Sequence, residues 1–134
     1  MCLNLFSFHR YARSKSGLGP EIVFSTEEDD ILVYEPSYLL RPEAVESFFV
    51  LHQLTGDPTY QEWGWEVFQA IERFCKTSSG YGGLDDIDII DKGPIDRMES
   101  FFMGETLKYL YLLQDPDTEI DILNKVSTQH EVKY

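Results

Sequence analysis

The sequence predicts an all-α fold built from helical hairpins. Three segments carry apolar residues at helical spacing, and short turns rich in Gly, Pro and Asp separate them. We expect helices over residues 42–54, 59–75 and 97–113. A Gly-Asp-Pro turn at 56–58 is short enough to join the first two as a helical hairpin. Hairpins with broad apolar faces need neighbours to cover them, which is typical of α/α architectures.

The segment before the first hairpin is expected to be mostly non-helical. Its Gly and Pro residues favour loops, and its apolar runs are too short for helices. In chain order we predict a weak short helix at 1–13, a loop at 14–21, a short apolar run at 22–24, an acidic surface turn at 27–30 and an extended stretch at 31–40.

Each predicted helix has its own apolar stripe and its own end signals. The stripe of the first helix comprises Val45, Phe48, Phe49 and Leu51, and that of the second comprises Tyr60, Trp63, Val67, Phe68, Ile71 and Phe74. Residues 76–95 are predicted to be a loop, since the alternation at 86–89 is too short for a strand. The third helix is expected to start with Asp96 as N-cap and Glu99 as its capping acid. The polar tail at 117–134 predicts no firm element.

Composition limits the possible functions. The chain has 134 residues, 24 acidic and 11 basic, and a net charge of −13. That balance argues against nucleic-acid binding, which needs clustered Lys and Arg, and it suits a protein that holds a divalent cation. Cys2 and Cys75 lie far apart and show no zinc-type spacing. No run of 18 apolar residues occurs in the chain, so we predict no membrane-spanning segment.

Two carboxylates at the start of the first helix are the strongest chemical signal. Pro42 suits the first helical position, and Glu43 and Glu46 then share one face of the opening turns. Like charges at this spacing cost about 0.2–0.5 kcal/mol, and the helix N-terminus returns about 0.3–1 kcal/mol. The pair is therefore tolerated without adding stability. It is suited to a cation, a sugar or a water molecule that needs activation.

Glu105 is the second unusual carboxylate. It follows Phe101 by four residues and Phe102 by three, which places it on an aromatic helix face. A buried carboxylate without a partner is costly, so this position indicates pairing or function. The alternative is an ordinary Glu105 that reaches solvent or pairs with Lys108.

Several of these segments resemble the class I α-1,2-mannosidases, glycoside hydrolase family 47. The residues that carry the resemblance are Gly-Leu-Gly-Pro-Glu-Ile-Val at 17–23, Tyr-Leu-Leu-Arg-Pro-Glu-Ala-Val-Glu-Ser at 38–47, Thr-Gly-Asp-Pro at 55–58, Trp-Gly-Trp-Glu at 63–66, Gly-Tyr-Gly-Gly-Leu at 80–84 and the whole stretch 96–113. They occur in order and at family-like spacing over residues 17–113, while residues 1–13 match less closely.

The resemblance implies an (α/α)7 barrel, of which residues 1–134 would form the C-terminal part of the catalytic domain. It also implies inverting hydrolysis of terminal α-1,2-linked mannose from high-mannose N-glycans, with a Ca²⁺ ion at the base of the pocket. An enzyme of the endoplasmic reticulum or Golgi is expected on the same grounds. Because the family's proposed catalytic acids lie upstream of this chain, the 134 residues alone should be inactive.

Individual residues acquire roles from the same resemblance. Glu43 matches the family's proposed general base, and Arg41 and Pro42 match residues that line the mannose pocket. Glu46 matches a carboxylate near the calcium waters. Phe101 matches a ring that stacks on sugar, and Glu105 a carboxylate that contacts sugar or metal-bound water.

The tail departs from the family pattern. Thr128 aligns with the threonine that binds calcium, but Gln129 stands where the family has an acid. Thr supplies neutral oxygens that Ca²⁺ accepts, although losing a nearby carboxylate should weaken the site. The alternative is that Thr128 is an ordinary surface residue.

Two other functional hypotheses remain open. The chain could be a non-catalytic relative that binds mannose-trimmed glycans in glycoprotein quality control. It could also be an orphan helical fragment whose exposed apolar faces associate with other proteins.

Overall fold

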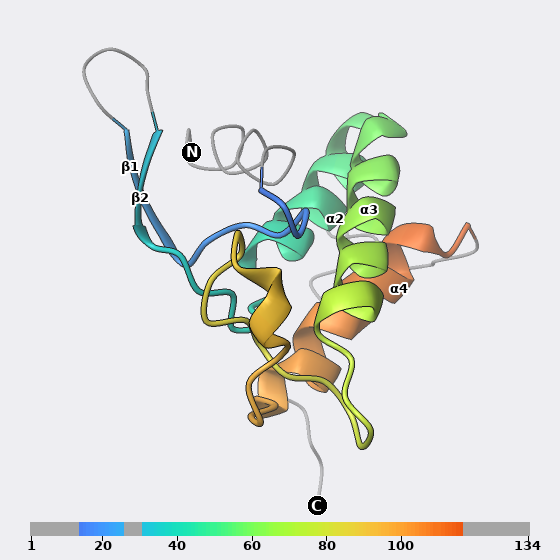
Figure 1. Ribbon diagram of the computed structural model, residues 1–134. Helices are drawn as coiled ribbons and strands as arrows, with labels where there is room; N and C mark the ends of the chain where they lie inside the picture. Colours follow the sequence, from blue (N-terminus) through green and yellow to red (C-terminus); the bar gives the residue numbers. More distant parts are fainter. Residues whose placement is uncertain (1–13, 26–30, 117–134) are drawn as a thin grey trace, which may run out of the picture.

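A small β hairpin extends from a cluster of helices (Figure 1). The computed structural model describes residues 14–25 and 31–116. The described elements, in chain order, are β1 (Ile22–Ser25), β2 (Ile31–Glu35), α2 (Glu43–Thr55), α3 (Thr59–Phe74), a 3₁₀ turn (Ile90–Lys92), a π-helical turn (Phe102–Thr106) and α4 (Leu107–Gln114). The predictions for 1–13, for the acidic turn at 27–30 and for 117–134 fall outside the described residues.

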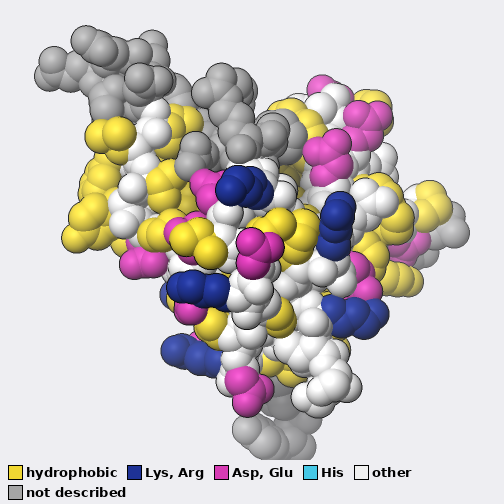
Figure 2. All heavy atoms as spheres, viewed as in Figure 1, with side chains coloured by type: hydrophobic (Ala, Val, Ile, Leu, Met, Phe, Trp, Pro, Cys, Tyr) yellow, Lys and Arg dark blue, Asp and Glu magenta, His cyan; other side chains and the backbone are white. Residues whose placement is uncertain are grey.

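The β hairpin is an addition to the predicted all-α fold. Strands β1 and β2 pair antiparallel, with Val23 opposite Val33 and Phe24 opposite Leu32. The apolar run at 22–24 and the extended stretch at 31–40 were predicted, but their pairing was not. Apolar side chains gather over this hairpin in Figure 2, and Phe24 is 54% exposed. The hairpin therefore carries apolar surface that the described residues do not cover.

Helices α2 and α3 form the predicted hairpin, within one residue at each end. Gly56 ends α2 in the left-handed region, with φ 68°, and its N–H donates to the carbonyl of His52 at 2.8 Å. Glycine is the residue that adopts this conformation without a steric penalty. The rings of Phe48 and Trp63 meet edge to face at 5.6 Å between centroids, which joins the two apolar stripes.

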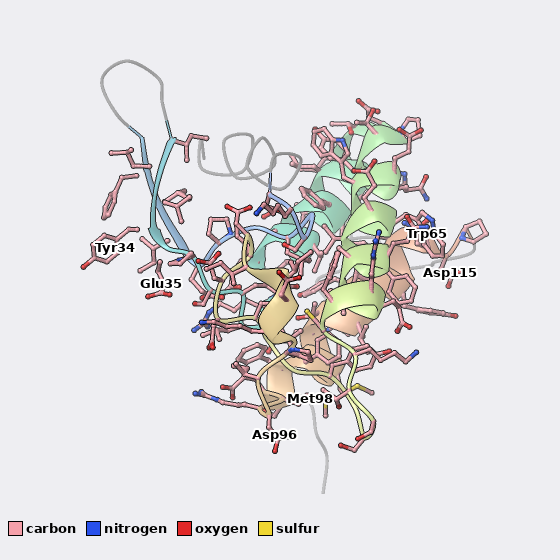
Figure 3. The ribbon with its side chains drawn as sticks, in the orientation of Figure 1. Tyr34, Glu35, Trp65, Asp96, Met98 and Asp115 are labelled. Atoms are coloured by element: carbon pink, nitrogen blue, oxygen red, sulfur yellow. The ribbon has the colours of Figure 1, made fainter. Side chains whose placement is uncertain are left out.

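The third helical segment starts later than predicted. Helical backbone begins at Ser100, not at residue 97, and it continues through the π-helical turn into α4. The N–H of Arg97 donates to the carbonyl of Ile95 at 2.9 Å, a bond that turns the chain instead of opening a helix. Asp96 is therefore not the N-cap, and Glu99 forms an ion pair with Arg97. Figure 3 shows Asp96 on the loop that precedes the helix.

The core lies where the two long helices meet α4 and the loop at 76–95. Its largest fully buried side chains are Phe49, Phe102, Leu18, Leu40, Ile71, Leu84, Ile87 and Leu113. Helices α3 and α4 approach closely at Gly64, where an added Cβ would lie 2.4 Å from Leu113 Cδ2. Cys75 is a free, fully buried thiol, and burial raises its pKa to about 12.

An apolar groove is formed by residues of α3 and α4. Its volume is about 330 Å³, and its lining comes from α3, the start of α4 and the end of α4. The lining residues are Gly64, Trp65, Phe68, Leu107, Leu110, Tyr111 and Gln114. Trp65, labelled in Figure 3, is 48% exposed. The expectation that these hairpins need further neighbours is consistent with this surface.

The loop at 76–95 contains no strand at 86–89, as predicted, and it fixes the segment that leads into α2. Tyr38 and Leu84 exchange two backbone hydrogen bonds, at 2.9 and 2.8 Å. The approach is possible because residue 83 is glycine: a Cβ there would lie 2.4 Å from the carbonyl oxygen of Tyr38. The chain is thereby held just before the residues with the predicted chemistry.

Gly83→Ala should destabilise the fold. The added methyl meets a backbone oxygen at 2.4 Å, which cannot rotate away as a side chain could. Overpacking of this kind costs about 1–3 kcal/mol of unfolding free energy. Urea unfolding followed by circular dichroism measures it.

Gly104→Ala is the matched control, because nothing lies within 4 Å of the Cβ it would add. In a helical turn alanine is favoured over glycine by about 0.8–1.0 kcal/mol, so this variant should be neutral or slightly stabilised. Equal unfolding free energies for the two variants would contradict the close approach of Gly83 to Tyr38.

Candidate functional site

The backbone takes a strained turn immediately before α2. Leu40 has φ 61°, and it is the one non-glycine residue with positive φ among the described ranges. A non-glycine residue in that region costs of order 1–3 kcal/mol and persists only when its surroundings hold it. Leu40 is fully buried, and its carbonyl accepts a 2.6 Å hydrogen bond from the hydroxyl of Thr106. The turn is thus fixed by a residue from the π-helical segment.

Arg41 is oriented by a carboxylate that the sequence analysis did not assign. Its Nε donates to Glu21 Oε2 at 2.5 Å, and the N–H of Leu39 donates to Glu21 Oε1 at 2.9 Å. The hydrogen bond and charge of Glu21 raise the pKa of Arg41, and the charges of Glu43 and Glu99 raise it further. The guanidinium lies 5.7 Å from the ring centroid of Phe101, in cation–π range.

Pro42 and Glu43 open α2. Pro42 lies at the N-cap and not at the predicted first helical position, and its carbonyl accepts the N–H of Glu46 at 2.8 Å. Pro42 is buried, whereas Glu43 is exposed. The proline ring therefore anchors the helix start while the carboxylate beside it remains in contact with solvent.

Glu46 lies one turn further along α2 and contacts α4. The hydroxyl of Tyr109 donates to Glu46 Oε1 at 2.9 Å. Burial, the hydrogen bond to Glu46 and the charge of Glu105 together raise the pKa of Tyr109 to about 12. A neutral phenol thus holds one oxygen of Glu46 and leaves the other available.

Glu105 is exposed, which agrees with the alternative of a glutamate that reaches solvent, one of the two that the sequence left open. The helix at this point is a π turn, in which the N–H of Leu107 donates to the carbonyl of Phe102. Three consecutive residues, 103–105, are exposed, while the next, Thr106, is fully buried. The wider turn presents Glu105 to solvent and directs Thr106 inward. The alternative pairing is not seen, because no ion pair joins Glu105 to Lys108 within the described residues. The Lys108 ammonium lies instead 4.9 Å from the ring centroid of Tyr109.

An open hollow of about 510 Å³ brings several of these groups together. It is lined by Glu46, Ser100, Phe101, Gly104, Glu105, Lys108 and Tyr109. Three of the predicted residues, Glu46, Phe101 and Glu105, therefore share one surface. Arg41 adjoins it through Phe101, and Glu43 lies one helical turn from Glu46. A ring face, carboxylates and a cation in one hollow can bind a polyhydroxylated ligand by stacking and hydrogen bonding.

The calcium prediction assigns Thr128 as a ligand and places Glu46 near the waters around the ion. Within residues 14–25 and 31–116, no three His, Cys, Asp or Glu side chains gather closely enough to hold a metal ion. Thr128, the predicted ligand, lies outside the described residues.

Sequence reasoning missed Glu21 and Thr106. Glu21 was visible only as part of a Gly-Pro-Glu motif whose role was unassigned, and Thr106 as a neighbour of Glu105. Each acts through a contact distant in sequence, since Glu21 reaches Arg41 across 20 residues and Thr106 reaches Leu40 across 66. Helical periodicity carries no signal for contacts of this kind.

Comparison with known proteins identifies relatives of this chain. The family described as "Glycosyl hydrolase family 47" matches residues 2–129. The match is longer than the 17–113 that the motifs predicted, and it includes most of the N-terminal segment.

Two curated relatives are α-mannosidases by name. Mannosyl-oligosaccharide 1,2-alpha-mannosidase MNS1 of Arabidopsis thaliana is 45% identical over 115 residues, which cover 86% of this chain and 20% of that protein. The endoplasmic reticulum mannosyl-oligosaccharide 1,2-alpha-mannosidase of Homo sapiens is 43% identical over 115 residues, covering 79% of this chain and 16% of that protein. The chain thus spans about a fifth of the length of the curated relatives it matches.

A solved structure confirms the fold prediction. The alpha-1,2-mannosidase from Trichoderma reesei superposes with a TM-score of 0.77 at 31% identity, covering 87% of this chain and 28% of that chain. The described part is mostly helical, with the two-stranded sheet as the addition. The helical hairpins are therefore part of an α/α barrel architecture.

The phenol of Tyr109 should titrate near pH 12, and Glu46→Gln should lower that midpoint. The glutamine keeps an oxygen acceptor but removes the negative charge that disfavours phenolate, while burial remains. NMR of tyrosine labelled with ¹³C at Cζ, assigned through Tyr109→Phe, measures the midpoint. Because the folded pKa lies above the ordinary value of about 10, the unfolding free energy should fall as pH rises from 10 to 12.

Glu62→Gln is the control for this titration, because Glu62 is an exposed acid in the first turn of α3. It should leave the Tyr109 midpoint unchanged. An unchanged midpoint in Glu46→Gln as well would show that the hydrogen bond between Tyr109 and Glu46 is absent in solution.

Proposed function

The chain belongs to glycosyl hydrolase family 47, and from this membership we propose that it forms part of the catalytic domain of a mannosyl-oligosaccharide 1,2-α-mannosidase. Its curated relatives carry that name, at 45% and 43% identity. The observation that supports the proposal most directly is the junction between the start of α2 and the π turn. There Arg41 lies over Phe101, next to a hollow lined by Glu46 and Glu105.

The proposed reaction is hydrolysis with inversion of terminal α-1,2-linked mannose in high-mannose N-glycans. An inverting glycosidase needs one acid for the leaving oxygen and one carboxylate that activates water, about 6.5–9.5 Å apart. Glu43 is proposed as the base: it accepts a proton from the attacking water as that water bonds to the anomeric carbon. The acid that protonates the leaving oxygen is supplied from outside these residues.

The other site residues are proposed to bind and orient the sugar. Phe101 offers a half-buried ring face for the apolar side of a mannose ring, and Arg41 donates to its hydroxyl groups. Glu46 has one oxygen held by Tyr109 and one free to accept, and exposed Glu105 accepts from the ligand or its waters. Pro42 forms part of the rigid wall beside the base.

Calcium is proposed as the cofactor, with Thr128 among its ligands. The ion prefers oxygen donors, which a threonine hydroxyl and backbone carbonyl supply. Glu46 and Glu105 would accept hydrogen bonds from the water molecules around the ion. Bound there, the ion would orient hydroxyl groups of the sugar.

The site of action is proposed to be the endoplasmic reticulum or the Golgi. The human relative carries the endoplasmic reticulum in its name. Within the part of the chain that the structure describes, no helix combines the length and apolarity needed to cross a bilayer.

A chimera tests the proposed activity. The matching segment of the Arabidopsis relative would be replaced by this chain, and hydrolysis of a high-mannose N-glycan would be followed by mass spectrometry and by ¹H NMR of the released mannose. We expect the chimera to release β-mannose first, as inversion requires. Glu43→Gln should lower kcat by about 10²–10⁴-fold, the usual contribution of a general base.

Glu62→Gln again serves as the matched control and should retain the activity of the parent chimera. The 134-residue chain by itself should release no mannose. Full activity of the Glu43→Gln chimera would overturn the assignment of the base. Glycan binding by the folded chimera without turnover would instead support the non-catalytic hypothesis.

Thr128→Val should weaken calcium binding by the same chimera. Valine matches threonine in shape but removes the hydroxyl oxygen, so about tenfold more Ca²⁺ should be needed for half-maximal activity and for half-maximal thermal stabilisation. Thr77→Val, a substitution in the loop at 76–95, is the control. An unchanged calcium requirement in Thr128→Val would remove this residue from the ligand set.

A further inference from the structure

The segment at 38–41 is held from several directions before α2 begins. Tyr38 is fixed by its backbone bonds to Leu84, and the N–H of Leu39 donates to Glu21 at 2.9 Å. The carbonyl of Leu40 accepts from Thr106 at 2.6 Å. Each of these bonds comes from a different part of the chain, so the conformation of this segment is imposed by tertiary contacts.

Leu40 is the point where the held segment is strained. Its left-handed φ of 61° is unfavourable for a residue with a branched side chain, and the side chain is fully buried. If the carbonyl of Leu40 were released, the backbone could relax toward an ordinary conformation. The direction in which Arg41 leaves the core would then change, because it is the next residue along the chain.

The π turn supplies the hydroxyl that prevents this relaxation. Thr106 is fully buried, and its Oγ1 reaches the Leu40 carbonyl across 66 residues. The same turn begins one residue after Phe101, over which the Arg41 guanidinium lies at 5.7 Å. A π turn is a rare irregularity that occurs frequently at functional sites. Here the π turn places the Thr106 hydroxyl against the carbonyl of Leu40, and it follows directly on Phe101, whose ring faces the Arg41 guanidinium.

We propose that Thr106 is a positioning residue that acts through Leu40. Its hydroxyl holds Leu40 in the left-handed conformation, which keeps the Arg41 guanidinium on Glu21 and over Phe101. The consequence for binding rests on the proposed function, in which Arg41 contacts the sugar. The local geometry itself does not depend on that function and is measurable in the chain as it exists.

NMR of the ¹⁵N-labelled 134-residue chain tests the geometry without any substrate. The Nε–H of Arg41 donates to a carboxylate, so its proton should resonate downfield and exchange slowly with water. Thr106→Val removes the hydroxyl with little change in volume. The Arg41 Nε–H should then lose its downfield shift and exchange at least about tenfold faster. Thr106→Ser keeps a hydroxyl and should restore both signatures.

Thr55→Val is the matched control. Thr55 also donates its hydroxyl to a backbone carbonyl, that of Leu51 at 2.7 Å, at the opposite end of α2. It should leave the Arg41 signal unchanged. If Thr106→Val lowers stability but leaves the Arg41 signal as in the parent chain, Thr106 is merely structural and the proposal fails.

A measurement on the unsubstituted chain covers the case in which Thr106→Val does not fold. If the contacts open as one unit, the amide proton of Leu39 and the Nε proton of Arg41 should show matching opening rates in hydrogen exchange. Independent opening of the two groups would contradict the proposal.

The chimera then separates this proposal from the proposed function. Thr106→Val should raise KM about tenfold or more, with a smaller change in kcat, because Arg41 is placed among the binding residues. Thr106→Ser should keep KM within about threefold of the parent value. An inactive parent chimera would refute the proposed function and leave the NMR result valid, whereas an unchanged KM in an active Thr106→Val chimera would refute the role of Thr106 in binding.

Discussion

A buried carbonyl group needs a donor, and the carbonyl of Leu40 finds one in the hydroxyl of Thr106. This bond joins two segments that are far apart in sequence, and the residues with the predicted chemistry lie on both sides of it. Arg41 and Glu43 follow Leu40, while Phe101 precedes the turn that carries Thr106 and Glu105 lies within it. Removing a buried donor leaves its acceptor unpaired at a cost of about 1–3 kcal/mol. The strained backbone at Leu40 is maintained because that cost opposes its release.

The site residues differ in burial and in how their charges are paired. The carboxylates with proposed chemical roles lie at the surface or half-buried: Glu43 and Glu105 are exposed, and Glu46 is half-buried. Tyr109 donates to Glu46 as a neutral phenol, and the charged Arg41 nearby is paired with Glu21. An acidic chain can thus keep two carboxylates, Glu46 and Glu105, in one hollow without burying an unpaired charge.

Periodicity predicted the parts of the fold in which one local pattern dominates. Helices α2 and α3 lie within one residue of their predicted ends because apolar stripes and a left-handed Gly56 specify them locally. The start of the third helix was misplaced because Asp96 and Glu99 resemble a capping box, while the backbone bond from Arg97 to Ile95 turns the chain there. Helical spacing left the environment of Glu105 undecided, because it assumes a regular helix where the structure has a π turn. Glu21 and Thr106 could not be found from local patterns, since each acts across 20 residues or more.

Cys75 gives the fold a particular behaviour toward oxidants. Thiol oxidation and disulfide exchange proceed through the thiolate, and a thiol with a pKa of about 12 forms almost none at neutral pH. Full burial also denies an oxidant access to its sulfur. In an oxidising compartment, the folded protein would therefore keep this cysteine reduced. Mispairing through Cys75 would be confined to chains that have not yet closed their core, so oxidation at this position would affect unfolded molecules and spare folded ones.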